Sequence, residues 1–142
     1  MPGVPYEMKF LMAERVWPKV GERFGLDSAM YRSYIRTAGI GESNLSQELL
    51  PDIPRFLADE RLGLAFLPSA GEVKLRVTAL AETFEEAQKL AMPLETYIRQ
   101  QAASVIYSFD RNEELPEAVG RVLRDQGKTL AVAESCTGGS IA

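Results

Sequence analysis

The chain of 142 residues carries 20 acidic and 16 basic side chains, a single cysteine and no histidine. One cysteine excludes an internal disulfide framework and favours a reducing compartment, so we expect a cytoplasmic protein. The lack of histidine excludes a Ser-His-Asp or Cys-His mechanism and a His-ligated zinc site within this chain. The longest uncharged stretches, 62–71 and 100–109, are about half as long as a membrane helix requires, so no membrane partner is expected.

The first predicted element is a short amphipathic helix over residues 5–17. Pro5 suits its first turn, and apolar side chains follow at helical spacing: Met8, Leu11, Met12 and Val16. Pro18 and Gly21 are expected to end this helix, and residues 21–27 are predicted to form a linker. A strand is predicted next, over residues 30–38, and its two faces carry different side chains: Tyr31 and Ile35 on one, Arg32, Tyr34 and Arg36 on the other.

Residues 39–41 form a predicted turn, after which Ser43 can cap a helix. That helix carries one apolar stripe and two prolines expected to break or bend it: Leu45, Leu49 and Ile53, with Pro51 and Pro54. Residues 62–67 and 73–80 are predicted to pair as an antiparallel hairpin across a turn at 68–71. The second of these strands alternates apolar and polar residues, which is typical of a sheet with one solvated face.

Thr83 and Glu86 have the spacing of a capping box at the start of another helix. Its predicted buried stripe is Ala87, Leu90, Leu94 and Ile98. Pro93 is expected to kink or split the helix. A short strand around residues 105–107 follows.

A new unit is predicted to begin after a linker at 110–112. It holds a helix with Leu115, Val119, Val122 and Leu123, ended by Gly127, and a short apolar strand over 129–133. We therefore predict an α/β class: an α+β middle module, with a small mixed sheet and an antiparallel hairpin packed against helices. The expected division is a remnant of one domain (1–20), a linker (21–27), the middle domain (28–109) and the truncated start of another domain (110–142).

The strongest candidate for chemistry is the segment 133–139, where a Ser- and Gly-rich turn follows the predicted strand. Backbone N–H groups of such a turn, at the start of a helix, can bind anions and oxyanions. The Ser135 hydroxyl can act as a nucleophile if a base is nearby. The alternative is a packing joint of small residues, in which Cys136 is only a small apolar side chain.

Residues 129–142 (TLAVAESCTGGSIA) resemble the opening of the nicotinamide mononucleotide deamidase domain of the CinA family of competence- and damage-inducible proteins. Residues 2–9 (PGVPYEMK) resemble the closing segment of that family's molybdopterin-binding-like domain. Residues 37–43 (TAGIGES) and 67–76 (LPSAGEVKLR) are similar to its KH-type middle module. The three matches occur in the family's order.

The resemblance implies that Ser135 is the nucleophile, and that Thr137, Gly138 and Gly139 contact the substrate. The family's activating lysine and tyrosine lie downstream of this motif, so we expect this chain by itself to be inactive as an amide hydrolase. The parent would be a homodimeric enzyme of pyridine nucleotide salvage that converts nicotinamide mononucleotide to nicotinate mononucleotide. No cofactor is implied for the deamidase part. The other activity resembles ADP-ribose pyrophosphatase, with a divalent metal in the amino-terminal domain. No metal ligand is assigned in this chain, and Glu7 is interpreted as a solvated acid at a helix start.

KH modules clamp a nucleic-acid backbone with a Gly-X-X-Gly loop. Here residues 39–42 are Gly-Ile-Gly-Glu, so the spacing is wrong and Glu42 would repel phosphate. The stripe of Arg32, Tyr34 and Arg36 is interpreted as an exposed sheet face. We therefore expect a linking and packing module and no nucleic-acid partner; the alternative is a nucleic-acid or partner-binding module linked to competence or DNA damage.

Overall fold

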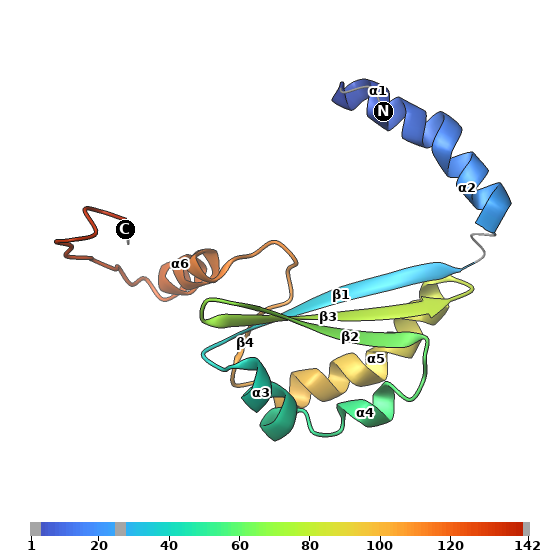
Figure 1. Cartoon of the computed structure of the whole chain (residues 1–142). Helices are drawn as coiled ribbons and strands as arrows, with labels where there is room; N and C mark the ends of the chain where they lie inside the picture. Colours follow the sequence, from blue (N-terminus) through green and yellow to red (C-terminus); the bar gives the residue numbers. More distant parts are fainter. Residues whose placement is uncertain (1–3, 25–27, 141–142) are drawn as a thin grey trace.

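The computed structural model describes residues 4–24 and 28–140. A sheet with strand order β2-β3-β1-β4 lies at its centre (Figure 1). Its strands are β1 (Ala29–Ala38), β2 (Leu62–Ser69), β3 (Glu72–Ala81) and β4 (Ile106–Ser108). The α+β class is confirmed, but the sheet is antiparallel in all three pairings and not mixed as expected. Strand β3 follows β2 through a hairpin and runs antiparallel to both β2 and β1. No parallel strand pair, with the long crossover connection that it needs, is therefore formed by these strands.

The β2–β3 hairpin turns through Ala70 and Gly71, since Ser69 already pairs with Glu72. Gly71 has a φ of +77°, a conformation that a side chain disfavours. The turn is therefore tighter than the predicted 68–71. Pro68 is accommodated within β2 because β2 is an edge strand, where a missing N–H costs no ladder hydrogen bond.

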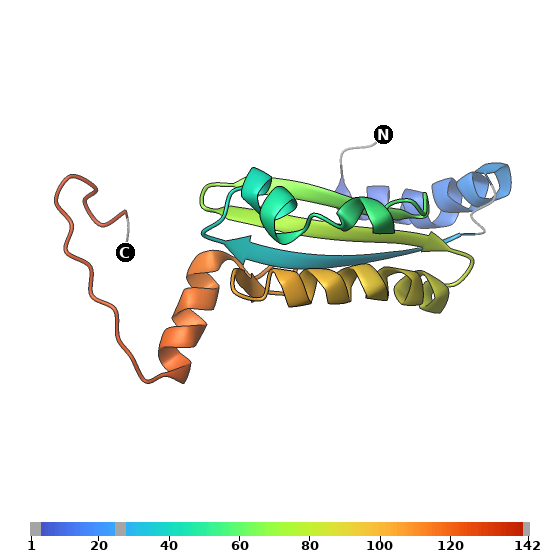
Figure 2. The same cartoon turned by 90° about the horizontal axis from the view of Figure 1, so that it is seen from below.

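The helices of the middle module all cover one face of the sheet (Figures 1 and 2). They are α3 (Glu42–Asn44), the π-helical turn η2 (Leu45–Leu49), α4 (Ile53–Phe56) and α5 (Phe84–Gln101). The core between the two layers is fully apolar at its centre and contains Leu45, Leu75, Val77, Leu94 and Ile98, each less than 1% exposed. Among the described helices, none covers the opposite face of the sheet (Figure 1).

After the turn at 39–41, the observed helical segments differ from the predicted helix in where they start and where they are interrupted. Ser43 lies inside α3 and does not cap it; Gly41 takes the cap position, without a side-chain hydrogen bond. The helix is interrupted between η2 and α4, where Pro51 lies. Pro54 stands in the first turn of α4, where its missing N–H has no intrahelical acceptor in any case.

Helix α5 begins as the sequence predicts. The Glu86 N–H donates to Thr83 Oγ1 over 3.2 Å, and the Thr83 N–H donates to Glu86 Oε2 over 3.3 Å. The capping box is thus confirmed. Pro93 does not split the helix, which runs continuously from Phe84 to Gln101. The packed face holds it together, with Ala87, Leu94 and Ile98 buried.

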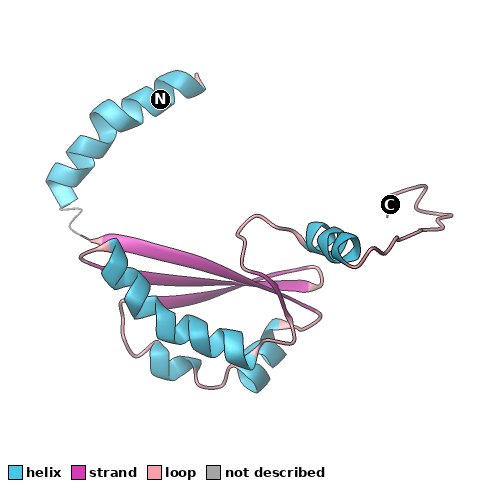
Figure 3. Ribbon diagram, turned by 180° about the vertical axis from the view of Figure 1, so that it is seen from behind, coloured by secondary structure: helices cyan, strands magenta, loops and turns pink. Residues whose placement is uncertain are grey.

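The amino-terminal segment is one helical rod that projects away from the sheet (Figures 1 and 3). It comprises α1 (Pro5–Leu11), the π-helical turn η1 (Met12–Val16) and α2 (Trp17–Phe24). The expectation that Pro18 and Gly21 end the helix is wrong. The wider π turn directly before Pro18 leaves room for the proline ring, so the helix continues. The predicted linker 21–27 is therefore helical to residue 24, and residues 25–27 lie outside the described residues.

Helix α6 (Leu115–Asp125) follows β4 and stands beyond the end of the sheet (Figure 2). The predicted strand over 129–133 is absent from the described structure. Leu130 and Val132 are instead 70% and 43% exposed. A strand needs a neighbour to satisfy its backbone, and no described strand lies beside this segment. In the described part of the chain, no helix is long and apolar enough to cross a membrane.

Candidate functional site

Helix α6 leads into the segment that carries the candidate residues. Its end has the geometry of a Schellman motif: the Lys128 N–H donates to the Leu123 carbonyl over 2.8 Å, and the Gly127 N–H to the Arg124 carbonyl over 3.0 Å. Gly127 has a φ of +62°, as its predicted role at the helix end requires. The chain then runs extended to residue 134.

Residues 135–139 form a turn, and Glu134 closes it. The Gly139 N–H donates to Glu134 Oε2 over 2.9 Å, and the Ser140 N–H donates to the Thr137 carbonyl over 3.1 Å. Gly138 and Gly139 have φ values of +59° and +96°, which glycine tolerates and other residues disfavour. The sequence thus explains the turn through its paired glycines.

The structure brings the predicted residues together on one exposed loop. Ser135, Thr137, Gly138 and Gly139 are all exposed, as is the Cys136 thiol. No helix follows within residues 135–140, so the expected helix N-terminus is not formed there.

Glu134 makes a contact in this turn that the sequence does not predict. Its carboxylate accepts a hydrogen bond from the Gly139 N–H across the turn. A carboxylate that receives a backbone N–H organises the loop. The Gly139 N–H is consequently engaged and does not serve as an oxyanion donor in this conformation.

The start of α6 is fixed to the sheet by a relay of side chains. Ser108 Oγ, at the end of β4, donates to Glu113 Oε2, and Arg121 Nε in α6 donates to Glu113 Oε1 over 2.8 Å. The Arg121 and Ser108 hydrogen bonds hold the pKa of Glu113 below its ordinary value. This relay orients the helix that precedes the Ser135 turn.

A second group of side chains holds the linker against β1. Arg36 is only 6% exposed; its Nη1 donates to the Arg111 carbonyl over 3.1 Å and its Nη2 to Glu72 Oε2 over 3.4 Å. The Tyr107 hydroxyl donates to the same Glu72 oxygen over 2.7 Å. Burial, followed by the Glu72 hydrogen bond, raises the pKa of Tyr107 to about 12. The interpretation of Arg36 as part of an exposed face is therefore wrong, since the linker covers it.

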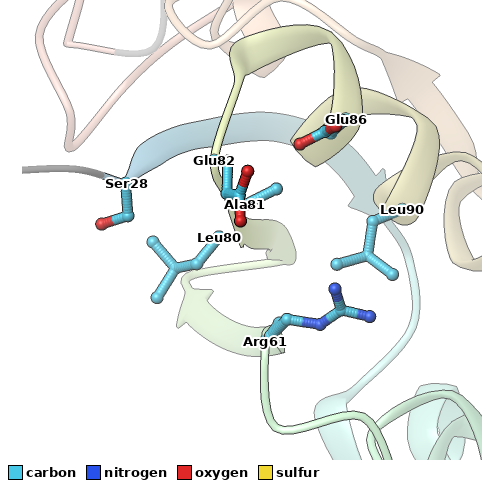
Figure 4. A pocket seen from close by; sticks show the side chains of 7 residues that line it. All are labelled: Ser28, Arg61, Leu80, Ala81, Glu82, Glu86 and Leu90. Atoms are coloured by element: carbon cyan, nitrogen blue, oxygen red, sulfur yellow. The ribbon is translucent and has the colours of Figure 1, made fainter.

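Several hollows of the middle module lie away from the Ser135 turn. One, of about 610 Å³, is an open depression at the start of α5, and its lining includes Arg61, Leu80, Glu86 and Leu90 (Figure 4). Asp59 already binds Arg61 with Oδ2 to Nη2 at 2.7 Å. A second hollow is lined by residues 39–42 and the hairpin turn, with Glu42 and Glu72 on its wall. Within the described residues, no group of three or more Cys, Asp or Glu side chains is placed to hold a metal ion.

Two family models match this chain, one over the middle module and one over α6 and the Ser135 turn. The family model described as the damage-inducible protein CinA KH domain matches residues 32–108, and the CinA C-terminal domain model matches residues 112–142. The chain belongs to the CinA family. The second match includes Ser135 and the whole candidate turn.

Whole-chain relatives agree with this membership. A CinA-like protein of Cytophaga hutchinsonii is 41% identical over 149 residues, which cover 100% of this chain and 33% of the relative. CinA-like proteins of Trichodesmium erythraeum and Frankia casuarinae are 39% and 35% identical, covering 99% and 100% of this chain and 32% and 33% of the relatives. The chain thus spans about a third of the length of these CinA-like relatives. The intact alpha subunit of aIF2 from Pyrococcus abyssi is similar at a TM-score of 0.41 and 11% identity over 75% of this chain and 45% of that chain, which is too remote to support an argument.

Proposed function

We propose that this chain is the linking module and the start of the catalytic part of a nicotinamide mononucleotide amidohydrolase. The observation that carries the proposal is the exposed Ser135 hydroxyl on a glycine-rich turn that Glu134 holds closed. Membership of the CinA family, with the C-terminal domain match over this turn, supports it. The middle module contributes architecture: its sheet fixes the start of α6 through Ser108, Glu113 and Arg121.

The proposed reaction is acyl transfer to serine. Ser135 Oγ attacks the carboxamide carbon as its proton passes to a base, and a C–O bond forms. The C–N bond then breaks, and ammonia leaves with a proton returned by that base. Water attacks the resulting ester, which releases nicotinate mononucleotide and restores the hydroxyl. Thr137, Gly138 and Gly139 line the approach, and the two glycines let the substrate come close to the backbone.

The base for this reaction is proposed to lie outside the 142 residues. Glu134 is engaged with the Gly139 N–H, and the chain has no histidine. On the resemblance, we propose that a lysine and a tyrosine downstream of the motif supply this base. We also propose, on the resemblance, a homodimeric cytoplasmic parent whose amino-terminal part is an ADP-ribose pyrophosphatase-like unit with a divalent metal.

The test is ammonia release from nicotinamide mononucleotide by the complete protein. Ser135→Ala should lower kcat by about a thousandfold or more, as loss of a nucleophile does in serine hydrolases. Ser140→Ala removes a hydroxyl on the same exposed loop and should retain the wild-type rate. Cys136→Ala should do the same, because the thiol is not the nucleophile. A Ser135→Ala enzyme as fast as wild type would overturn the proposal, and so would an equally active 142-residue chain.

A further inference from the structure

The first half of strand β1 has a free edge. Its neighbour on that side, β4, pairs only with Arg36 and Thr37, whereas β3 pairs with all ten residues of β1 on the other side. Among the described residues, no strand pairs with the β4 side of β1 from Ala29 to Ser33, a stretch here named the free edge. Unpaired backbone groups at the edge of a sheet are a template on which another chain can add a strand.

The backbone groups of alternate residues point out of the free edge. On the side of β4, the Ala38 N–H donates to the Val105 carbonyl over 3.0 Å. The β1–β3 register is unbroken along β1, so the direction of the backbone groups alternates regularly from Ala38 back to the start of the strand. The N–H and C=O groups of Met30 and Arg32 therefore face away from β3 and toward the free edge.

The free edge lacks the backbone features that block strand pairing. The other outer strand of this sheet, β2, carries Pro68, whose missing N–H interrupts pairing. The free edge contains neither proline nor glycine. It is also bordered by exposed apolar groups on both faces of the sheet. Met30 is 46% exposed on the face without helices, and Phe84 of α5 is 54% exposed on the other face, where its ring centre lies 5.6 Å from that of Tyr31.

The space beside the free edge is short. At one end it is bounded by the linker after β4, where the Arg111 guanidinium lies 5.2 Å from the centre of the Tyr34 ring. At the other end the amino-terminal rod points away from the sheet (Figures 1 and 3). A second β1 strand that runs in the opposite direction fits this space, because its own start at Ala29 can lie opposite Ser33 and does not reach the linker.

We propose that the free edges of two copies of this chain pair about a two-fold axis at Tyr31, which joins their sheets into one antiparallel sheet. Met30 of each copy then lies opposite Arg32 of the other and exchanges both backbone hydrogen bonds with it. A pairing centred on Arg32 would place two guanidinium groups directly opposite each other, which destabilises a strand pair. The pairing centred on Tyr31 avoids this and forms an aromatic cross-strand pair.

Helix α5 borders the paired edges on the helical face. Phe84, Met92 and Glu95 lie on one side of this helix, at helical spacing. The Ser33 hydroxyl donates to Glu95 Oε1, so this side of α5 runs along the free edge. Met92 is 59% exposed, and its burial together with that of Phe84 favours association. The interface is small, so we expect a reversible dimer. This pairing deepens the homodimer proposed above and rests on that part of the proposed function.

The test measures the monomer–dimer equilibrium of the 142-residue chain by sedimentation equilibrium. Every sample carries Leu130→Lys, Val132→Lys and Cys136→Ala, so that the exposed segment 129–133 and the native thiol do not contribute to association. Arg32→Pro removes the outward N–H and should raise the dimer Kd by about tenfold or more. Arg32→Ala removes the same side chain but keeps the N–H, so its Kd should stay within about threefold of the reference.

A pair of cysteine variants tests the register without proline. In the proposed pairing the two Tyr31 residues form a non-hydrogen-bonded pair, with Cα atoms about 4.5 Å apart, which a disulfide can bridge. Tyr31→Cys should therefore give a disulfide-linked dimer under mild oxidation. Arg32→Cys should do so far more slowly, because the two Arg32 positions are diagonal neighbours about 7–8 Å apart.

Equal cross-linking of the two cysteine variants would overturn the proposed register. Equal Kd values for the proline and alanine variants would overturn pairing through the free edge and leave the homodimer to another surface. A monomer at every concentration would overturn the pairing as well. None of these measurements depends on hydrolysis at Ser135, so the pairing and the proposed reaction fail or hold separately.

Discussion

At the scale of single residues, carboxylates in this acidic chain act as acceptors for neutral donors as well as for cations. Glu134 receives the Gly139 N–H, Glu86 the Thr83 N–H, and Glu72 the Tyr107 hydroxyl. The first organises the candidate turn, the second starts α5, and the third ties β4 to the hairpin. Each bond joins a charged acceptor to a neutral donor, which makes it stronger than a neutral pair.

Tyr107 gives a prediction at alkaline pH. Its folded-state pKa of about 12 lies above the ordinary value of 10.0, so the folded chain holds the phenol proton more tightly than the unfolded chain does. Its contribution to stability is complete below pH 10 and is lost as the pH rises toward about 12. The free-energy gap between wild type and Tyr107→Phe, from urea denaturation, should therefore shrink over that interval. Tyr6→Phe, at a 78% exposed position, should show no such change, and a gap that widens with pH would contradict the assignment.

At the scale of secondary-structure elements, the capping box of α5 gives a second stability prediction. Thr83→Ala removes the oxygen that accepts the Glu86 N–H, and should cost about 1 kcal/mol in the free energy of unfolding. Thr96→Ala makes the same chemical change at an exposed position inside the same helix. There alanine should be neutral or slightly stabilising, because it is the better helix former. Equal losses in the two variants would show that the cap contributes nothing.

Elements with local signals are the ones that the sequence predicts well. The alternation of 73–80 and the stripe of Leu94 and Ile98 place β3 and α5 correctly, because burial follows periodicity. The extent of the first helix was mispredicted, since proline at position 18 is accommodated by the π turn before it. The strand at 129–133 is not formed, because a strand depends on a neighbour that its own residues do not specify.

The candidate site was predictable to a similar degree. Ser135 and the paired glycines were identified from residue type and from resemblance, and the turn follows from the positive φ values of Gly138 and Gly139. The Glu134 hydrogen bond was not predicted, because it depends on how the turn closes. The burial of Arg36 was also missed: its partner Glu72 is 36 residues away and the Arg111 carbonyl is 75 residues away, so no local pattern reveals them.

At the scale of the whole molecule, apolar surface is left exposed on both sides of the middle module. The amino-terminal rod exposes Phe10 and Trp17, each 55% accessible, and the carboxy-terminal segment exposes Val122, Leu130 and Val132. The chain spans about a third of its relatives, so such surfaces are where further parts of a longer protein can pack. The middle module, in contrast, encloses its own core between sheet and helices.

The extended segment 129–133 gives the last prediction. An unpaired apolar segment recruits strand partners, so the 142-residue chain should self-associate with rising concentration, measured by sedimentation equilibrium. Leu130→Lys with Val132→Lys should shift the chain toward monomer, because two charges oppose stacking of identical segments. Phe10→Lys tests the amino-terminal rod, and Met92→Lys, at a 59% exposed site on α5, controls for added charge. A monomer at all concentrations would contradict the prediction, and dissociation caused by Phe10→Lys but not by the double variant would assign self-association to the rod.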